Sequence, residues 1–246
     1  MIIFLIFINS LLFSQNYEAN FNKANKLFQS NEFQKAITEY ENLSQENLKS
    51  AELFYNLGNA YYRNEQIGLA ILNYNKALKL DDGFEDARFN LAIAKLKTID
   101  KFEEVPKFFL DDINDSIART FNEKQWTIIN ISFSFVLLGL FIFFRTRKAS
   151  NSKKQALILI FITIFFFAFT SFYGYKQLKY ESSYTNGVIT ATSTYIKSSP
   201  DENSKDLIIL HEGTSFELLD KVGDWVELKL SDGNKGWASI HDIQRF

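Results

Sequence analysis

The sequence predicts a multidomain membrane protein: an all-α region of helical hairpins, then two transmembrane helices, then a C-terminal small all-β barrel. Three observations predict it. Residues 17–100 follow the helical period and contain almost no glycine or proline. Residues 126–175 hold two long uncharged stretches and 11 of the 26 phenylalanines. After residue 182, apolar and polar residues alternate, which is typical of strands.

Composition excludes several classes of function. The 27 Lys and Arg residues balance 29 Asp and Glu residues, and this argues against a nucleic-acid-binding protein, which needs a basic excess. The chain contains no Cys, so disulfide frameworks, Cys-ligated zinc and thiol catalysis are excluded. Its two His residues, His211 and His241, are too few for us to expect a metal site or a cofactor.

Residues 1–14 are predicted to be a signal peptide. Residues 2–13 are almost all Ile, Leu and Phe. Twelve helical residues span about 18 Å, which is too short for a bilayer core of about 30 Å. No Lys or Arg precedes this stretch. An uncleaved anchor, or an apolar cap on the first helix, is therefore the alternative.

Residues 126–144 and 156–175 are predicted to be transmembrane helices. Their 19 and 20 residues span about 28 and 30 Å, and Trp126 and Tyr173 suit the aromatic belt at a membrane surface. A buried hairpin, the alternative, would need a larger soluble domain to cover it. Neither stretch contains an ionisable residue, so we expect an anchor and not an ion pathway.

The segment between them, residues 145–155, carries five positive charges and no acid. The positive-inside rule places this loop in the cytoplasm of a two-pass protein of the inner (cytoplasmic) membrane. Both large flanking regions then lie in the periplasm. Residues 101–125 and 176–185 are expected to be linkers.

The helical region is internally repetitive, with a period of about 34 residues. The clearest unit resembles the tetratricopeptide repeat (TPR) through Phe54, Leu57, Gly58, Tyr61, Ala70, Tyr74 and Ala77. Small Gly58 and Ala70 are expected to let the paired helices approach closely. We expect a TPR region over 15–100, with repeats at about 17–50 and 51–84 and a capping helix at 85–98.

The resemblance implies a concave face that binds extended peptides or helices. Its candidate residues are the amides Asn22, Asn56 and Asn90 and the aromatic side chains Phe21, Tyr55, Tyr62 and Phe89. Amides one repeat apart could hydrogen-bond a peptide backbone, or they could simply pack beside the groove. The aromatic side chains could line the groove or pack between repeats. The basic residues of carboxylate-clamp TPRs are missing, so binding of an acidic C-terminus is not expected.

The C-terminal region predicts short strands, with Asp232-Gly233 as a hairpin turn. Residues 186–246 resemble a bacterial SH3-like (SH3b) domain through Tyr195–Pro200, Gly223-Asp-Trp225 and Gly236-Trp237. We expect positive φ at Gly213 and Gly236. Tyr195, Trp225 and Trp237 are candidates for the ligand surface or the core. The two tryptophans are expected to fill the barrel core or its mouth, and for Trp237 the core is favoured over ligand binding.

The order of these parts resembles BatE-type members of the Bacteroides aerotolerance (Bat) family. That resemblance implies partners among von Willebrand factor A-domain membrane proteins and a MoxR-type ATPase. We therefore expect a non-enzymatic membrane scaffold or adaptor that binds proteins. The alternative is a cell-wall tether or sensor whose SH3b domain binds peptidoglycan peptides. No catalytic residues are expected, since hydrolase, P-loop and zinc-protease motifs are missing.

Overall fold

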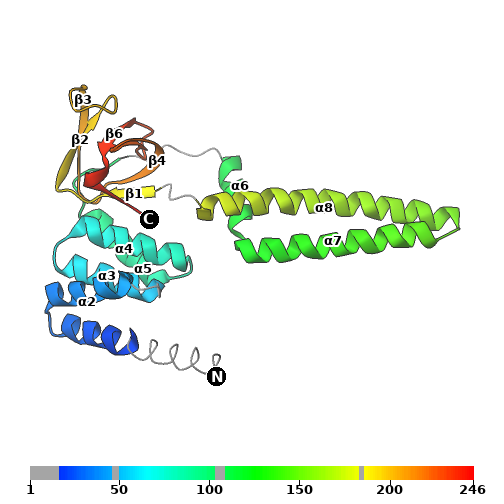
Figure 1. Cartoon of the computed structure of the whole chain (residues 1–246), viewed down its shortest axis with the longest axis horizontal. Helices are drawn as coiled ribbons and strands as arrows, with labels where there is room; N and C mark the ends of the chain where they lie inside the picture. Colours follow the sequence, from blue (N-terminus) through cyan, green and yellow to red (C-terminus); the bar gives the residue numbers. More distant parts are fainter. Residues whose placement is uncertain (1–16, 46–49, 103–108, 183–185) are drawn as a thin grey trace, which may run out of the picture. The chain divides into compact units, whose positions relative to one another are not determined.

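The structure is a computed structural model that describes residues 17–45, 50–102, 109–182 and 186–246 (Figure 1). The predicted signal peptide lies outside the described residues. The chain forms two compact units. One combines the N-terminal helical region with the C-terminal strands, and the other contains the long apolar helices between them.

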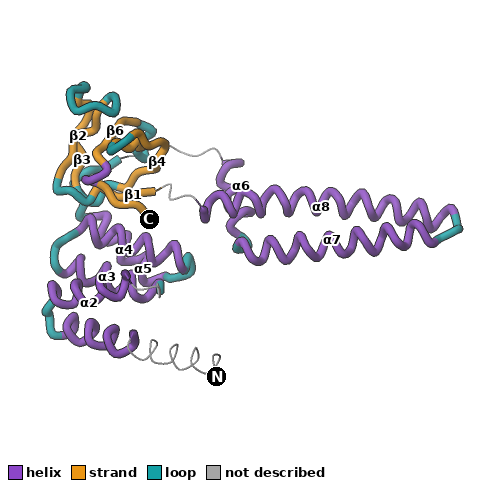
Figure 2. The backbone as a smooth tube through the Cα atoms, viewed as in Figure 1, coloured by secondary structure: helices purple, strands orange, loops and turns teal. Residues whose placement is uncertain are grey.

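The helical region stacks as helical hairpins (Figure 2). Residues 17–29 form its first helix, and it continues with α2 (Phe33–Gln45), α3 (Ala51–Arg63), α4 (Ile67–Leu80) and α5 (Glu85–Leu96). The turns within the two hairpins match, since Asn31 (φ 60°) and Glu65 (φ 64°) both adopt left-handed backbone at equivalent positions of successive repeats. The predicted all-α hairpins are thus confirmed.

Close helix packing explains the small residues of the repeat. A Cβ atom at Gly58 would lie 2.8 Å from the Tyr74 ring and 3.3 Å from the Ala70 carbonyl oxygen. Ala70 and Tyr74 are themselves buried. The expectation that Gly58 and Ala70 allow α3 and α4 to approach is confirmed.

The second unit contains α6 (Phe109–Arg119), α7 (Glu123–Thr146) and α8 (Ser150–Ser182). The α7 and α8 helices form a long hairpin, as Figure 1 shows. Both are long and apolar enough to cross a membrane, since an 18-residue stretch in each has a mean hydropathy of 2.3 and 2.4, respectively. Helix covers much of both segments expected as linkers, and only residues 147–149 separate the two long helices.

The C-terminal region is an antiparallel sheet of seven strands with the order β3-β2-β6-β5-β4-β1-β7. Its elements are β1 (Asn186–Ile189), β2 (Ser193–Lys197), β3 (Asp206–His211), β4 (Ser215–Val222), β5 (Trp225–Lys229), β6 (Lys235–Ser239), a 3₁₀ turn (Ile240–Asp242) and β7 (Ile243–Arg245). The predicted hairpin is confirmed, because β5 pairs with β6 and Gly233 has φ 89° in the turn.

The sheet packs directly against the helical region within their common unit. Val188 of β1 is fully buried in the core of the helical hairpins, and Phe246 packs against the same core. In the other direction, Phe102, which follows α5, packs against the core of the sheet. The two regions therefore share apolar contacts in both directions.

A carboxylate ties the segment after α5 to the sheet. Asp100 Oδ2 accepts hydrogen bonds from the His211 backbone N–H (2.7 Å) and the Thr214 hydroxyl (2.5 Å). Asp100 Oδ1 lies 2.9 Å from His211 Nδ1. Burial by itself raises the pKa of Asp100, but the hydrogen bonds from Thr214 and His211 outweigh it, so the pKa lies below its ordinary value.

A second carboxylate, that of Glu212, also joins the sheet to the helical region, because it caps the α4 helix. The α4 helix has no acid in its first turn, and its N-cap residue Gln66 makes no side-chain capping bond. Glu212, between β3 and β4, accepts a hydrogen bond from the Gly68 N–H at 3.2 Å. A negative charge at a helix N-terminus is favourable, so the sheet supplies a cap that the helix lacks.

Candidate protein-binding sites

A concave hollow of about 240 Å³ lies between the helices of the repeat region. It is lined by Phe28, Asn59, Tyr62, Arg63, Tyr74, Asn90 and Ile93. These residues come from the first helix, α3, α4 and α5, so adjacent repeats build the hollow together. Its volume is below the roughly 300–1,000 Å³ of small-molecule pockets, and it suits side chains of a peptide.

A shared amide joins the repeats at the base of this hollow. Asn59 Oδ1 accepts hydrogen bonds from the Tyr74 hydroxyl and from Asn90 Nδ2, both at 2.8 Å. Burial raises the pKa of Tyr74, with Tyr55 and Tyr62 adding to the effect. The Tyr74 hydroxyl therefore remains a proton donor in this cluster.

The same cluster occurs one repeat earlier. Asn25 Oδ1 accepts from the Tyr40 hydroxyl at 2.5 Å and from Asn56 Nδ2 at 3.4 Å. Burial, with a smaller contribution from Glu52, raises the pKa of Tyr40 to about 12. Asn25, Tyr40 and Asn56 each lie one repeat before Asn59, Tyr74 and Asn90, respectively. The chain thus contains a repeated Asn–Tyr–Asn hydrogen-bond cluster between adjacent repeats.

This cluster determines what the three predicted amides do. Asn56 and Asn90 donate to an amide of the preceding repeat, whereas Asn22 is exposed and lines a separate hollow of about 460 Å³ along the first helix. The sequence analysis missed Asn25 and Asn59, although their spacing of one repeat was a signal. Asn90 and Asn59 still line the concave hollow, which gives it polar groups beside aromatic walls.

Of the four predicted groove aromatics, Tyr62 lines the hollow. The Lys97 ammonium lies 4.4 Å from its ring centroid, and the Arg63 guanidinium lies 4.7 Å from the Phe33 ring centroid. Cations over aromatic faces are held by electrostatic attraction to the ring. Tyr62 therefore lies in an aromatic hollow with cationic groups nearby.

The other three aromatics lie elsewhere. Phe21 packs edge-on against Tyr40, and Tyr55 packs against Phe84 with ring centroids 4.9 Å apart. Phe89 on α5 is 67% exposed and does not line the hollow. Ring packing within their own repeats thus accounts for Phe21 and Tyr55, and Phe28 takes a groove position that the sequence analysis did not assign.

The two tryptophans of the sheet lie on its outer face, so the interpretation that favoured the core is wrong. Along β6 the buried residues are Gly236 and Ala238, and Trp237 between them is half-buried. Along β5 the buried residues are Val226 and Leu228, and Trp225 is half-buried. Strand alternation places a residue on one face only, and the small residues of β6 take the inner one.

Gly236 has no positive φ, which corrects a second expectation. A Cβ atom there would lie 2.4 Å from Ile196 Cγ2 and 3.0 Å from the Lys197 carbonyl oxygen. The glycine is required by close packing between β6 and β2. Gly213, in contrast, has φ 88° as expected.

Apolar side chains continue along the outer face onto the β2–β3 hairpin. Tyr195 is 54% exposed and pairs across the hairpin with Ile209, which is 43% exposed. Leu207, at the register shift of this hairpin, is 49% exposed but lies toward the inner side, because its Cδ1 atom is 3.2 Å from the position of a Cβ atom at Gly236. Among the described residues, β3 is an edge strand. Lys197 and Glu227, the cross-strand neighbours of Trp237, lie on the same face, so it offers an aromatic surface flanked by charges.

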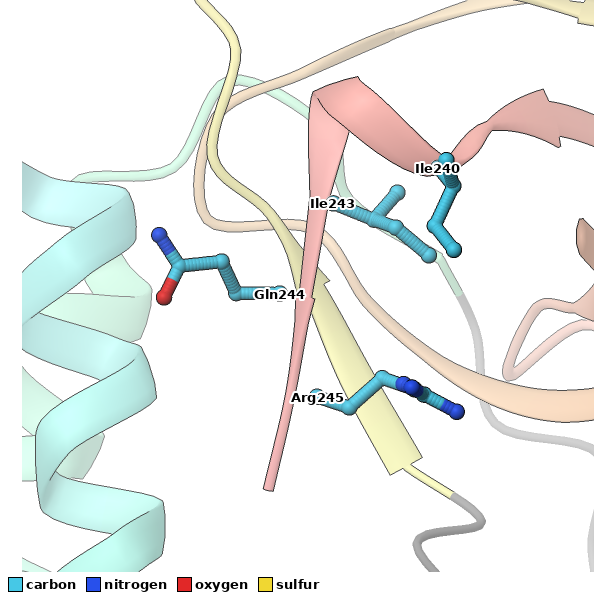
Figure 3. Close-up of a pocket in the computed structure, with 4 residues that line it drawn as sticks. All are labelled: Ile240, Ile243, Gln244 and Arg245. Atoms are coloured by element: carbon cyan, nitrogen blue, oxygen red, sulfur yellow. The ribbon is translucent and has the colours of Figure 1, made fainter. Parts of the chain in front are cut away.

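The chain's C-terminal segment borders another hollow, of about 350 Å³, lined by Ile240, Ile243, Gln244 and Arg245 (Figure 3). Gln244 extends toward the neighbouring helices, and the Arg245 side chain points the other way. The lining contains no acid or nucleophile. In the described part of the chain, no group of three or more His, Asp or Glu residues could hold a metal ion.

Comparison with family models identifies both modules. Residues 24–65 match a TPR repeat model, residues 51–84 match a tetratricopeptide repeat model, and residues 192–244 match a bacterial SH3 domain. The chain therefore carries TPR repeats and a bacterial SH3 domain. A search of curated proteins found no match to this chain.

Proposed function

We propose that this protein is a non-enzymatic, membrane-anchored adaptor whose TPR and SH3 modules bind protein partners. The observation that carries the proposal is the concave hollow built by adjacent repeats. It combines aromatic walls, two amides and Arg63, and its size suits peptide side chains. TPR repeats and bacterial SH3 domains generally bind proteins or peptidoglycan, which supports an adaptor role.

The anchor is the α7–α8 hairpin, inserted as two spans of the inner membrane. Both helices have the length and composition of membrane spans. The basic residues lie at the turn of the hairpin, in and beside residues 147–149, so the positive-inside rule assigns this turn to the cytoplasm. The TPR and SH3 modules then lie together in the periplasm.

The partners we propose follow from the resemblance to the Bat family. They are von Willebrand factor A-domain membrane proteins, acting with a MoxR-type ATPase system in aerotolerance or envelope stress. The order of leader, TPR repeats, membrane hairpin and SH3 domain supports this proposal. Direct TPR contact is expected with the membrane proteins, because these share the membrane with the anchor.

A second candidate function is a cell-wall tether or sensor. The exposed outer face of the SH3 domain favours it, because Tyr195, Trp225 and Trp237 offer aromatic surface for peptidoglycan peptides. The acidic balance of residues 182–246, with 6 basic and 10 acidic residues, disfavours binding to anionic wall polymers. The peptide part of the wall would then be the ligand.

The test is crosslinking in native membranes, purification of the full chain, and identification of its partners by mass spectrometry. An Arg63→Glu variant reverses a charge in the hollow, and Arg88→Glu makes the same change on α5 outside it. We expect Arg63→Glu to lose the partner proteins and Arg88→Glu to keep them. A Trp237→Ala variant tests the SH3 face in parallel.

Two results would overturn the proposal. In one, Arg63→Glu and Arg88→Glu retain the same partner proteins. In the other, the full chain recovers mainly muropeptides, and Trp237→Ala alone abolishes that recovery. The second result would establish the wall tether in place of the adaptor.

A further inference from the structure

The short helix α6 is fastened to the end of the membrane hairpin. Figure 1 shows it crossing α8 near the C-terminal end of that helix, opposite the turn at 147–149. Three polar contacts hold it there: Tyr173 hydroxyl to Asn114 Oδ1 (2.8 Å), Trp126 Nε1 to the Ala118 carbonyl (3.0 Å), and Lys176 Nζ to Asp115 Oδ1 (3.0 Å). The α6 helix is thus fixed to both helices of the hairpin, α7 and α8.

Apolar side chains on α6 are exposed to solvent beside these contacts. Phe109, Ile113 and Ile117 recur at every fourth position, so they lie on one side of the helix. Ile117 packs against the buried cluster of Ala118, Trp126 and Tyr173. Phe109 is 62% exposed and Ile113 is 49% exposed. One apolar side therefore begins at the hairpin and continues into exposed surface.

This exposed side continues the apolar surface of the hairpin. Near the same end of α8, Phe169, Phe172 and Tyr175 are 40%, 59% and 68% exposed. The buried Trp126 and Tyr173 are stacked, with ring centroids 6.2 Å apart, and lie between α6 and the long helices. Tryptophan and tyrosine are enriched at the boundary between membrane and water. The fastening point of α6 therefore has the composition of that boundary.

We propose that α6 is an interfacial helix that lies along the surface of the bilayer and inserts Phe109 and Ile113 among the lipids. This inference rests on the proposed membrane insertion of the hairpin. Helices of this kind bury an apolar side at the boundary between headgroups and acyl chains and keep a polar side in water. The three polar contacts hold α6 at that depth, and its exposed Arg119, about 120° around the helix from Ile113, lies on the water side.

The absence of Cys from the sequence makes a site-specific test straightforward. Single-cysteine variants Ile113→Cys, Arg119→Cys and Phe141→Cys of the full chain are spin-labelled in phosphatidylcholine–phosphatidylglycerol vesicles. Accessibility to oxygen, which concentrates in lipid, is compared with accessibility to a water-soluble nickel chelate. Phe141, on α7 and 57% exposed, reports on the hairpin. We expect the oxygen-to-nickel ratio at 113 to be several-fold above that at 119 and to approach that at 141.

Other outcomes overturn the inference in distinguishable ways. Equal ratios at 113 and 119, with a lipid-type ratio at 141, would leave the membrane anchor intact and remove α6 from the bilayer. Water-type ratios at both 113 and 141 would overturn the anchor as well. Low accessibility of 113 to both reagents would mean that protein covers this side of α6.

Discussion

At the scale of single residues, the repeat period predicted the repeats but not the roles of the amides within them. Asn25 and Asn59 could have been found from the sequence, since Tyr40 and Tyr74 follow them at the same spacing. A sequence cannot show which donor meets which acceptor, however. In the structure, Asn59 accepts from two partners, so Asn90 serves the protein's own stability as well as the hollow.

Asp100 carries the residue-scale prediction. Its side chain is 11% exposed and accepts hydrogen bonds from Thr214 and His211. Because the folded-state pKa is lowered below the ordinary 3.8, the carboxylate stabilises the fold fully above that value. This stabilisation is lost as the pH falls through the lowered folded pKa. We expect Asp100→Asn to cost about 1.5–3 kcal/mol at pH 7, the usual range for hydrogen bonds to a charged group.

The measurement is thermal unfolding of the full chain in detergent between pH 7 and pH 2. The difference between the unmodified protein and Asp100→Asn should shrink below pH 3.8. Glu202→Gln, an exposed carboxylate on the SH3 domain, serves as the control and should behave like the unmodified protein. A gap between the unmodified protein and Asp100→Asn that stays constant with pH would refute the role of the charge.

At the scale of elements, periodicity predicted the type of the repeat helices, the two long apolar helices and the β5–β6 hairpin, but not α6, which lies in a segment expected as a linker. It predicted ends and faces less well. The α8 helix continues to Ser182 because Lys, Gln and Leu after the apolar stretch are good helix formers. The face of Trp237 could not be derived, because alternation separates two faces without saying which is inside. Its neighbours Gly236 and Ala238 are small enough to fit against the other strands, so they face inward and Trp237 faces outward.

The cap that Glu212 gives to α4 leads to the element-scale prediction. Glu212→Ala removes the acceptor of the Gly68 N–H, and N-cap losses cost about 0.5–2 kcal/mol. Amides in the first turn of α4 should then exchange with solvent deuterium faster. Adding Gln66→Asp gives the helix a local cap and should restore their protection.

A double-mutant cycle separates this role from a general effect of Asp at position 66. If Glu212 is the cap, Gln66→Asp should protect the first turn more in the Glu212→Ala background than in the unmodified protein. Equal protection in both backgrounds would mean that Glu212 does not cap α4.

At the scale of the whole molecule, the TPR and SH3 regions form one compact unit, where the sequence offered only two separate modules. The contact between them joins residues far apart in the chain, since Asp100 and His211 are separated by 111 positions. Local periodicity carries no information about such pairs. The adaptor we propose would therefore present its hollow and its SH3 face from a single body.

Valine substitution at two glycine positions tests whether the TPR and SH3 regions hold a fixed position relative to each other. Gly213, with φ 88°, sits where a Cβ atom would lie 2.6 Å from Thr98 Cγ2 and 3.1 Å from Ile71 Cδ1, both in the helical region. Gly223 also has positive φ, 58°, but no atom lies within 4 Å of a Cβ atom placed there. Valine at either position strains the backbone by at least about 1–2 kcal/mol. Only Gly213→Val also pushes the two regions apart.

Spin labels on Glu18→Cys in the first helix and Lys205→Cys before β3 report their separation by double electron–electron resonance. We expect a single narrow distance distribution in the otherwise unmodified chain and with Gly223→Val. With Gly213→Val, the distribution should broaden or shift, because the added methyl groups cannot fit against Thr98 and Ile71. A broad distribution in the unmodified chain would show two independently moving modules. The adaptor would then act through two linked modules that move independently. Its avidity would come from the raised effective concentration of the second module and not from a fixed joint surface.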